Sequence, residues 1–179
     1  MKDTHKTFDG LLVLEYQSGN TKAMSLLVKR YHKKLCGHAF WYTKDIDVSK
    51  DIVQDSWKVI IQKMNSLKEP NNFGSWATKI VTRKSLDFIN KENRKREHLK
   101  GYYEASKNGE DRLDKESEIN KLLHAIRLLP KNQQIVLKLF YIEEYSLKEM
   151  SNILEISVVT VKSRLFHARE KLKTILKKQ

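Results

Sequence analysis

Apolar residues recur every three or four positions along most of the chain, which is the spacing of one face of an α-helix. The pattern predicts a short first helix around Phe8 that ends near Gly19, a long second helix, and a third over residues 48–67. A fourth helix follows Pro70, and after a stretch without periodicity the pattern resumes at Ile119 with four more. We therefore expect an all-α fold.

The last two predicted helices form a helix-turn-helix over residues 145–173. Ser146 and Glu149 have the spacing of a capping box, in which each side chain bonds the backbone amide of the other residue. The turn begins at Glu155, and Ser157 is a good N-cap for the second helix. Helix-turn-helix motifs often have glycine at the position of Glu155, because the backbone there is left-handed.

The second helix of this motif has two different faces. One is an apolar row of Val158, Val161, Leu165, Ala168, Leu172 and Leu176. The other presents Thr160, Lys162, Ser163, Phe166, His167 and Lys171. A helix with one buried face and one face of donors and cations can lie in the major groove of DNA. An amphipathic hairpin with a solvated basic face would show the same pattern.

The composition favours a polyanionic partner. The 179 residues include 35 Lys and Arg against 22 Asp and Glu, a net charge of +13. Residues 1–97 carry 19 basic and 11 acidic side chains and residues 121–179 carry 12 and 5, whereas residues 98–120 carry 4 and 6. The predicted organisation is a helical domain over 1–97, a flexible linker over 98–117 and a helical domain over 118–179.

The sequence argues against a membrane span, an internal disulfide and a metal site. No run approaches the ~20 apolar residues of a membrane span, and residues 1–10 lack the apolar core of a signal peptide, so we expect a cytoplasmic protein. Cys36 is the single cysteine, which excludes an internal disulfide. His32, Cys36 and His38 match no strong zinc spacing, and we expect no metal and no cofactor.

Two further stretches carry candidate chemistry. The third predicted helix has a polar face of Asp51, Gln54, Asp55 and Lys58, which suits solvent, a docking protein or, less readily, a divalent ion for nuclease chemistry. The segment after Pro70 places Phe73 and Trp76 beside a polar loop. It then adds a row of Lys79, Arg83, Asn90 and Arg94. Aromatics beside cations suit single-stranded nucleic acid, although each ring taken by itself suits a core better than a stacking platform.

The order of these segments resembles the extracytoplasmic-function (ECF) sigma factors of bacterial RNA polymerase. LVLEYQSGNTKAMSLLVKRYHKKL resembles the first two helices of sigma domain two, and DVSKDIVQDSWKVI resembles its helix for docking on the polymerase core. FGSWATKIVTRKSLDFINK resembles the segment that recognises and opens the −10 promoter element. The C-terminal helices resemble sigma domain four, which recognises the −35 element.

The resemblance implies three sets of contact residues. The clamp helices of the largest polymerase subunit would contact Asp51, Gln54, Asp55 and Lys58. With the cations that follow the loop, the −10 set is Asn71, Asn72, Phe73, Ser75, Lys79 and Arg83. With the outward residues of the first turn, the −35 set is Ser157, Thr160, Lys162, Ser163, Phe166 and His167. The family commonly has asparagine where this chain has Arg83, and frequently arginine where it has His167.

The function expected from this resemblance is that of a sigma factor, a protein without catalytic activity that directs core polymerase to promoters and assists strand opening. The family also implies an anti-sigma factor as a partner. A stand-alone helix-turn-helix regulator is the alternative, although residues 1–97 resemble neither a dimer seam nor an effector domain. A nuclease would need more metal ligands than the chain obviously supplies.

Overall fold

The computed structural model describes residues 2–99 and 118–177, and every regular element within them is helical. The chain forms two compact units, residues 1–103 and 104–179, here called the N-terminal and C-terminal units. Residues 98 and 99 continue the fourth helix, and the rest of the predicted linker lies outside the described residues. Within the described ranges, no helix is both long enough and apolar enough to cross a membrane.

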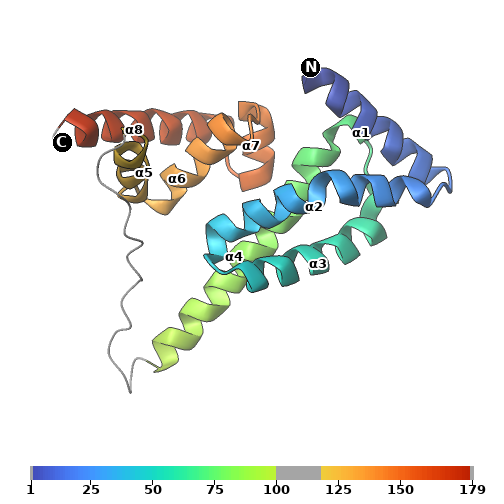
Figure 1. The fold of residues 1–179 in the computed structure, drawn as a ribbon, viewed down its shortest axis with the longest axis horizontal. Helices are drawn as coiled ribbons and strands as arrows, with labels where there is room; N and C mark the ends of the chain where they lie inside the picture. Colours follow the sequence, from blue (N-terminus) through green and yellow to red (C-terminus); the bar gives the residue numbers. More distant parts are fainter. Residues whose placement is uncertain (1, 100–117, 178–179) are drawn as a thin grey trace. The chain divides into compact units, whose positions relative to one another are not determined.

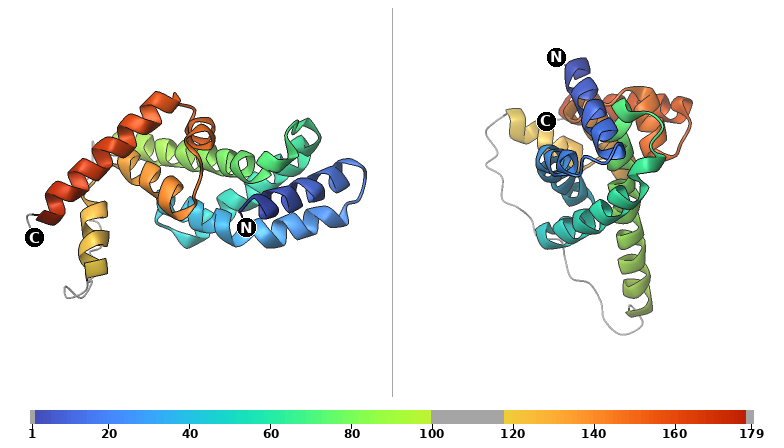
Figure 2. Two further views of the ribbon diagram at one scale, coloured as in Figure 1. Left: turned by 90° about the horizontal axis from the view of Figure 1, so that it is seen from above. Right: turned by 90° about the vertical axis from the view of Figure 1, so that its right-hand side faces the viewer.

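The described part of the N-terminal unit, residues 2–99, contains four α-helices, α1 (Lys2–Gln17), α2 (Lys22–Thr43), α3 (Ile46–Lys63) and α4 (Phe73–Leu99). Two 3-10 turns, η1 (Met64–Ser66) and η2 (Pro70–Asn72), connect α3 to α4. Helices α2, α3 and α4 pack against one another, and α1 lies beside α2 and against η2 (Figures 1 and 2). The distal half of α4 extends beyond α2 and α3 (Figure 1).

The ends of these helices follow the local chemistry of the sequence. Gly19 has a φ of 107°, a left-handed conformation that suits glycine, and it ends α1 as predicted. The Asp45 carboxylate accepts from the amides of Asp47 and Val48 and so caps α3. The α-helix stops at Lys63, four residues before the predicted end, and the side-chain amide of Gln17 donates to the carbonyls of Met64 and Leu67 beyond that end.

The C-terminal unit consists of α5 (Glu118–Arg127), α6 (Lys131–Leu137), the π-helical turn η3 (Lys138–Ile142), α7 (Leu147–Leu154) and α8 (Val158–Lys177). Helices α5, α6 and α7 all pack against α8. Their shared core is Leu129, Val136, Leu137, Leu139, Tyr145, Met150, Ile153, Val161, Leu165 and Ala168. The predicted apolar row of α8 is buried at its centre, while Val158 and Leu176 at its two ends are 36% and 40% exposed.

The π-helical turn has no counterpart in the predictions. Lys138 and Glu143 are five residues apart, and the amide of Glu143 donates to the Lys138 carbonyl over 3.0 Å. The Lys138 ammonium also pairs with the Glu143 carboxylate at 3.0 Å, with both side chains more than nine-tenths buried. Burial of a charge is costly unless a partner is close, so this pair links the two ends of the turn inside the core.

Candidate nucleic-acid interface

Helices α7 and α8 form the predicted helix-turn-helix. The Ser146 amide donates to the Glu149 carboxylate at 2.8 Å and the Glu149 amide donates to the Ser146 hydroxyl at 3.3 Å, which confirms the capping box. Glu155 has a φ of 55°, the left-handed conformation predicted for this turn. The Ser157 hydroxyl accepts from the Thr160 amide at 3.0 Å and so caps α8, also as predicted.

Helix α8 presents a side-chain stripe to solvent, on the face opposite Val161, Leu165 and Ala168. Five residues of the predicted −35 set are exposed, namely Ser157, Lys162, Ser163, Phe166 and His167, and Thr160 is half-buried. The Phe166 ring is 60% exposed and meets the His167 ring edge-on at 5.5 Å between centroids. In the first turn, the Ser157 and Thr160 hydroxyls bond each other at 2.8 Å, so both have local partners.

Val159 was missed by the sequence analysis, although it lies on this same stripe. Its side chain is 75% exposed, and it precedes Lys162, Ser163 and Phe166 by three, four and seven positions. The sequence did offer one signal of its exposure, because Val159 is an apolar residue that lies one position away from the apolar row of α8. Exposed methyl groups at the start of such a helix can contact the methyl group of thymine.

The predicted −10 loop lies at the start of α4. Asn71 and Asn72 are exposed in η2, and the Ser75 hydroxyl donates to the Asn72 carbonyl at 3.0 Å. Lys79 is half-buried and Arg83 is exposed, one and two turns further along α4. The structure therefore places five of the six predicted residues on η2 and the first half of α4.

Phe73 is the exception within that set, and its assignment to DNA contact is corrected by the structure. Its side chain is 0% exposed. The ring meets Tyr31 edge-on at 5.1 Å, stacks with Trp57 at 6.5 Å, and lies 6.2 Å from the ring of Trp76. Phe73 therefore belongs to the core under the loop, the alternative that the sequence had left open for both rings.

The polar face of α3 is exposed along its whole length. Asp51, Gln54, Asp55 and Lys58 all reach solvent, whereas Ser49, Ile52, Val53, Ser56, Trp57 and Ile60 are buried on the opposite side. Lys58 hydrogen-bonds Asp55 at 2.8 Å; this bond and the attraction between the charges lower the pKa of Asp55 and raise the pKa of Lys58. Both groups are thus charged at neutral pH.

Ile61 extends this polar face and was also missed. It is 44% exposed and follows Lys58 by three positions and Gln54 by seven. An exposed branched apolar side chain at the edge of a polar row is typical of a protein docking surface.

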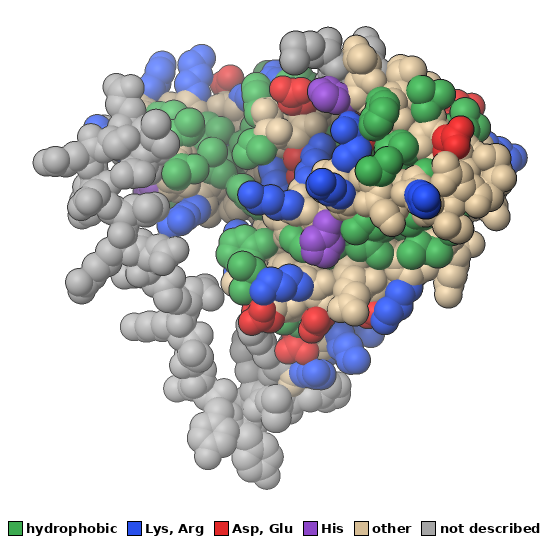
Figure 3. All heavy atoms as spheres, turned by 45° about the vertical axis from the view of Figure 1, so that its right-hand side comes forward, with side chains coloured by type: hydrophobic (Ala, Val, Ile, Leu, Met, Phe, Trp, Pro, Cys, Tyr) green, Lys and Arg blue, Asp and Glu red, His purple; other side chains and the backbone are tan. Residues whose placement is uncertain are grey.

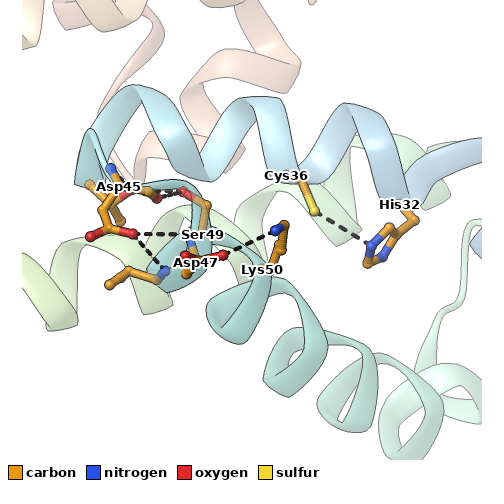
Figure 4. A network of polar contacts seen from close by, with 8 residues as sticks. His32, Cys36, Asp45, Asp47, Ser49 and Lys50 are labelled. Atoms are coloured by element: carbon orange, nitrogen blue, oxygen red, sulfur yellow. Dashed lines mark hydrogen bonds and ion pairs between the residues drawn. The ribbon is translucent and has the colours of Figure 1, made fainter.

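The structure separates His38 from His32 and Cys36, the other two residues of α2 that were considered as metal ligands. The Cys36 thiol lies 3.6 Å from Nε2 of His32, near the Asp45, Asp47, Ser49 and Lys50 network at the start of α3 (Figure 4). Burial raises the pKa of Cys36, and the nearby charge of Lys50 opposes this only partly. His38 is buried elsewhere and bonds the Thr82 hydroxyl at 2.8 Å. Among the described residues, no group of three His, Cys, Asp or Glu could hold a metal ion.

Cationic side chains reach solvent on both units. Figure 3 shows Lys and Arg side chains over much of the visible surface, between exposed apolar groups. Along α4 the exposed cations continue past Arg83 to Lys91, Arg94 and Lys95. Such a distribution suits the phosphates of nucleic acid.

Comparison with known families decides between the remaining interpretations. Residues 27–95 match the family description "Sigma-70 region 2", and residues 119–172 match "Sigma-70, region 4". The two matches together cover more than half of the chain, and they contain α3, the −10 loop, α7 and most of α8. The chain is an ECF sigma factor of the sigma-70 family.

Relatives of this sigma factor match over nearly their full length. RNA polymerase sigma factor SigV of Bacillus subtilis is 28% identical over 89% of this chain and 95% of its own. The ECF RNA polymerase sigma-E factor of Haemophilus influenzae is 27% identical over 90% of this chain and 92% of its own. The fold matches that of sigma factor RpoE from Bartonella quintana, with a TM-score of 0.70 and 20% identity over 88% of this chain and 98% of that one.

The activity of the chain follows from this family membership. As a sigma factor, it directs RNA polymerase core to specific promoters at the initiation of transcription. A stand-alone regulator would not require the region 2 match over α3 and α4, and that alternative is not favoured.

Proposed function

We propose that this sigma factor uses three separate surfaces, one for the polymerase core and two for promoter DNA. The polar face of α3, with Ile61 at its edge, docks on the clamp helices of the largest polymerase subunit. The loop of Asn71, Asn72 and Ser75 holds an unpaired base of the −10 element, and Lys79 and Arg83 hold the adjoining phosphates. The exposed stripe of α8 recognises the −35 element.

The observation that carries this proposal is the two-faced geometry of α8. Its inner face is fixed in the core by Val161, Leu165 and Ala168, all at most 4% exposed, while its outer stripe projects Lys162 and Phe166 into solvent. A helix held in this way presents its side chains to the major groove with little further ordering cost.

Strand opening without a nucleotide-hydrolysing site must be driven by binding. Unpairing costs on the order of a few kcal/mol per base, and capture of the released base by the protein offsets this cost. We propose that the sigma factor itself catalyses no reaction, since RNA synthesis belongs to the core enzyme, and that it acts in the cytoplasm beside the chromosome.

An anti-sigma factor is the further partner that we propose. The solved RpoE of Bartonella quintana is in complex with the anti-sigma factor NepR, and solved CnrH, 24% identical with a TM-score of 0.64, is in complex with the cytosolic domain of CnrY. The exposed apolar side chains of both units would suit such a protein.

Binding of promoter DNA in the presence and absence of core polymerase tests the proposal directly. A gel-shift assay with the full chain should show specific binding only when core polymerase is present. Specific binding by the chain alone would instead support a stand-alone regulator, and cleavage with added divalent metal would support a nuclease.

Docking on the core depends on the polar face of α3. The double variant Gln54→Ala, Asp55→Ala should bind core polymerase about tenfold more weakly, because polar groups at interfaces govern orientation and often affinity. Asp87→Ala, which removes an exposed carboxylate from α4 of the same unit, is the control. Equal core affinities of the folded double variant and the wild type would exclude this face from docking.

Recognition of the −35 element depends on Lys162. Lys162→Ala should weaken promoter binding by about 1–3 kcal/mol if the ammonium contacts a base, or reduce the salt slope by about one if it contacts phosphate alone. Lys173→Ala removes the same charge roughly 16 Å further along α8 and is the matched control. The proposal fails if binding by holoenzyme responds equally to both changes.

The −10 preference depends on the polar residues of the loop. Replacing Asn71, Asn72 and Ser75 together, while keeping Phe73 and Gly74, should change the ratio of affinities for the preferred −10 base and the other bases by about tenfold, since a mismatched base costs about 1–3 kcal/mol. Permanganate reactivity of unpaired thymines measures opening. Core affinity and −35 binding serve as internal controls, and an unchanged base preference would place recognition elsewhere.

A further inference from the structure

The −10 loop rests directly on backbone atoms of α1. A Cβ atom added to Gly10 would overlap Oδ1 of Asn71 and would lie 3.2 Å from the Asn71 backbone nitrogen. Any side chain at position 10 would therefore require the Asn71 amide group to move from its place on α1. Helix α1 precedes the loop by some sixty residues and lies outside the region 2 match, so the family comparison assigns nothing to it.

The other end of the loop rests on the hydroxyl of Tyr31. A Cβ atom added to Gly74 would lie 2.8 Å from Oη of Tyr31 and 3.2 Å from its Cε1. The Tyr31 ring also meets the buried Phe73 ring edge-on, at 5.1 Å between centroids. Tyr31 therefore contacts the two residues that join the loop to α4.

Asp9 fixes the position of this tyrosine. The Tyr31 hydroxyl donates to Oδ2 of Asp9 at 2.6 Å, and Nε of Arg30 donates to Oδ1 at 2.7 Å. The Asp9 side chain is only 4% exposed, so each bond is made by a carboxylate largely removed from water. Charge-assisted bonds of this kind are stronger than neutral ones and define the donor's position.

We infer that Asp9 and Tyr31 are positioning residues for −10 recognition. They fix the position of the loop of Asn71, Asn72 and Ser75 relative to α1 and α2. Asp9 and Gly10 are neighbours in α1. Asp9 binds Tyr31, which lies against Gly74 at one end of the loop, and Gly10 lies against Asn71 at the other end. The inference rests on the proposed role of that loop. A displaced loop would bind the released base in altered geometry and change its preference.

The variant Tyr31→Phe tests this role because it removes the hydroxyl and keeps the ring against Phe73. In holoenzyme made from the full chain, Tyr31→Phe and Asp9→Asn should each reduce discrimination between −10 single-base variants by about tenfold, which is of the order by which one mismatched base changes affinity. Core affinity and the response to −35 changes should stay at the wild-type level. Tyr16→Phe, which removes a hydroxyl from the same unit, is the control.

A double-mutant cycle with Gly74 separates positioning from general stability. Gly74→Ala alone should impair opening, because the new Cβ meets Oη of Tyr31. In the Tyr31→Phe background that oxygen is absent and the nearest Tyr31 atom is Cε1 at 3.2 Å, so the added methyl should cost less than in the wild type. Circular dichroism establishes that each variant is folded, and if Tyr31→Phe unfolds, Gly74→Ala alone still tests the contact.

The outcomes distinguish this inference from the proposed function. Suppose that Tyr31→Phe lowers promoter opening by the same factor for all −10 sequences and gives additive effects in the cycle. That result would show that Asp9 and Tyr31 only stabilise the core, and it would overturn the inference. If replacing Asn71, Asn72 and Ser75 changes base preference while Tyr31→Phe and Asp9→Asn do not, the loop recognises DNA without this support. If the loop replacement itself has no effect, the proposed function fails first.

Discussion

Replacing Phe73 with alanine is expected to lower the free energy of unfolding of the N-terminal unit by about 3–5 kcal/mol, the usual cost of deleting a fully buried aromatic ring. The ring is 0% exposed and lies among the rings of Tyr31, Trp57 and Trp76. Because these rings support the start of α4, the cavity would form directly beneath the −10 loop. Most of the stability of a unit of this size would be lost.

Chemical denaturation followed by circular dichroism measures this effect, and Phe73→Leu provides the comparison. Leucine retains much of the volume but has no aromatic face, so it should restore most of the stability and also preserve −10 preference. If Phe73→Leu folded normally yet lost recognition of the unpaired base, the ring would have to leave the core and stack on DNA, which would contradict its assignment to the core.

Removing one partner of the buried ion pair in the C-terminal unit should be similarly severe. Lys138→Met removes the ammonium group that lies 3.0 Å from the buried Glu143 carboxylate, and the expected loss in the free energy of unfolding is about 3–5 kcal/mol. The double variant Lys138→Met, Glu143→Leu removes both charges, and it should recover most of this loss because packed apolar groups replace the pair at similar volume.

Thermal unfolding of both variants tests the assignment. Lys148→Met, at an exposed position of α7, is the matched control and should unfold like the wild type. Equal destabilisation by the single and double variants would show that the side chains matter for shape alone. A near-neutral single variant would show that the pair is solvated.

The helices were predictable because apolar periodicity and capping chemistry are local properties of the sequence. The capping box at Ser146, the left-handed Glu155 and the end of α1 at Gly19 all depend on residues within one helical turn. The π-helical turn was not predictable in this way. It depends on a pairing between Lys138 and Glu143 inside a core, and a buried lysine in an apolar stretch gives no local signal of that geometry.

The residues of the candidate site were likewise predictable where they depend on local spacing and not where they depend on contacts between helices. The stripe of α8 was identified by its spacing, apart from Val159, which was overlooked because an apolar residue beside an apolar row suggests burial. Phe73 could not be assigned to core or surface from its position next to a polar loop, since that choice depends on rings contributed by α2 and α3. The Asp9 contact with Tyr31 joins residues 22 positions apart on different helices, which no periodicity reports.

The aromatic cluster around Phe73 also has a spectroscopic consequence. The chain has three tryptophans, and all of them, Trp41, Trp57 and Trp76, belong to the N-terminal unit. Tryptophan emission from the full chain therefore reports on that unit alone, without signal from the helix-turn-helix. The ring centroids of Trp57 and Trp76 lie within 6.5 Å of that of Phe73, so this emission should change when the aromatic cluster beneath the −10 loop unfolds. Unfolding of the C-terminal unit alone should leave it unchanged.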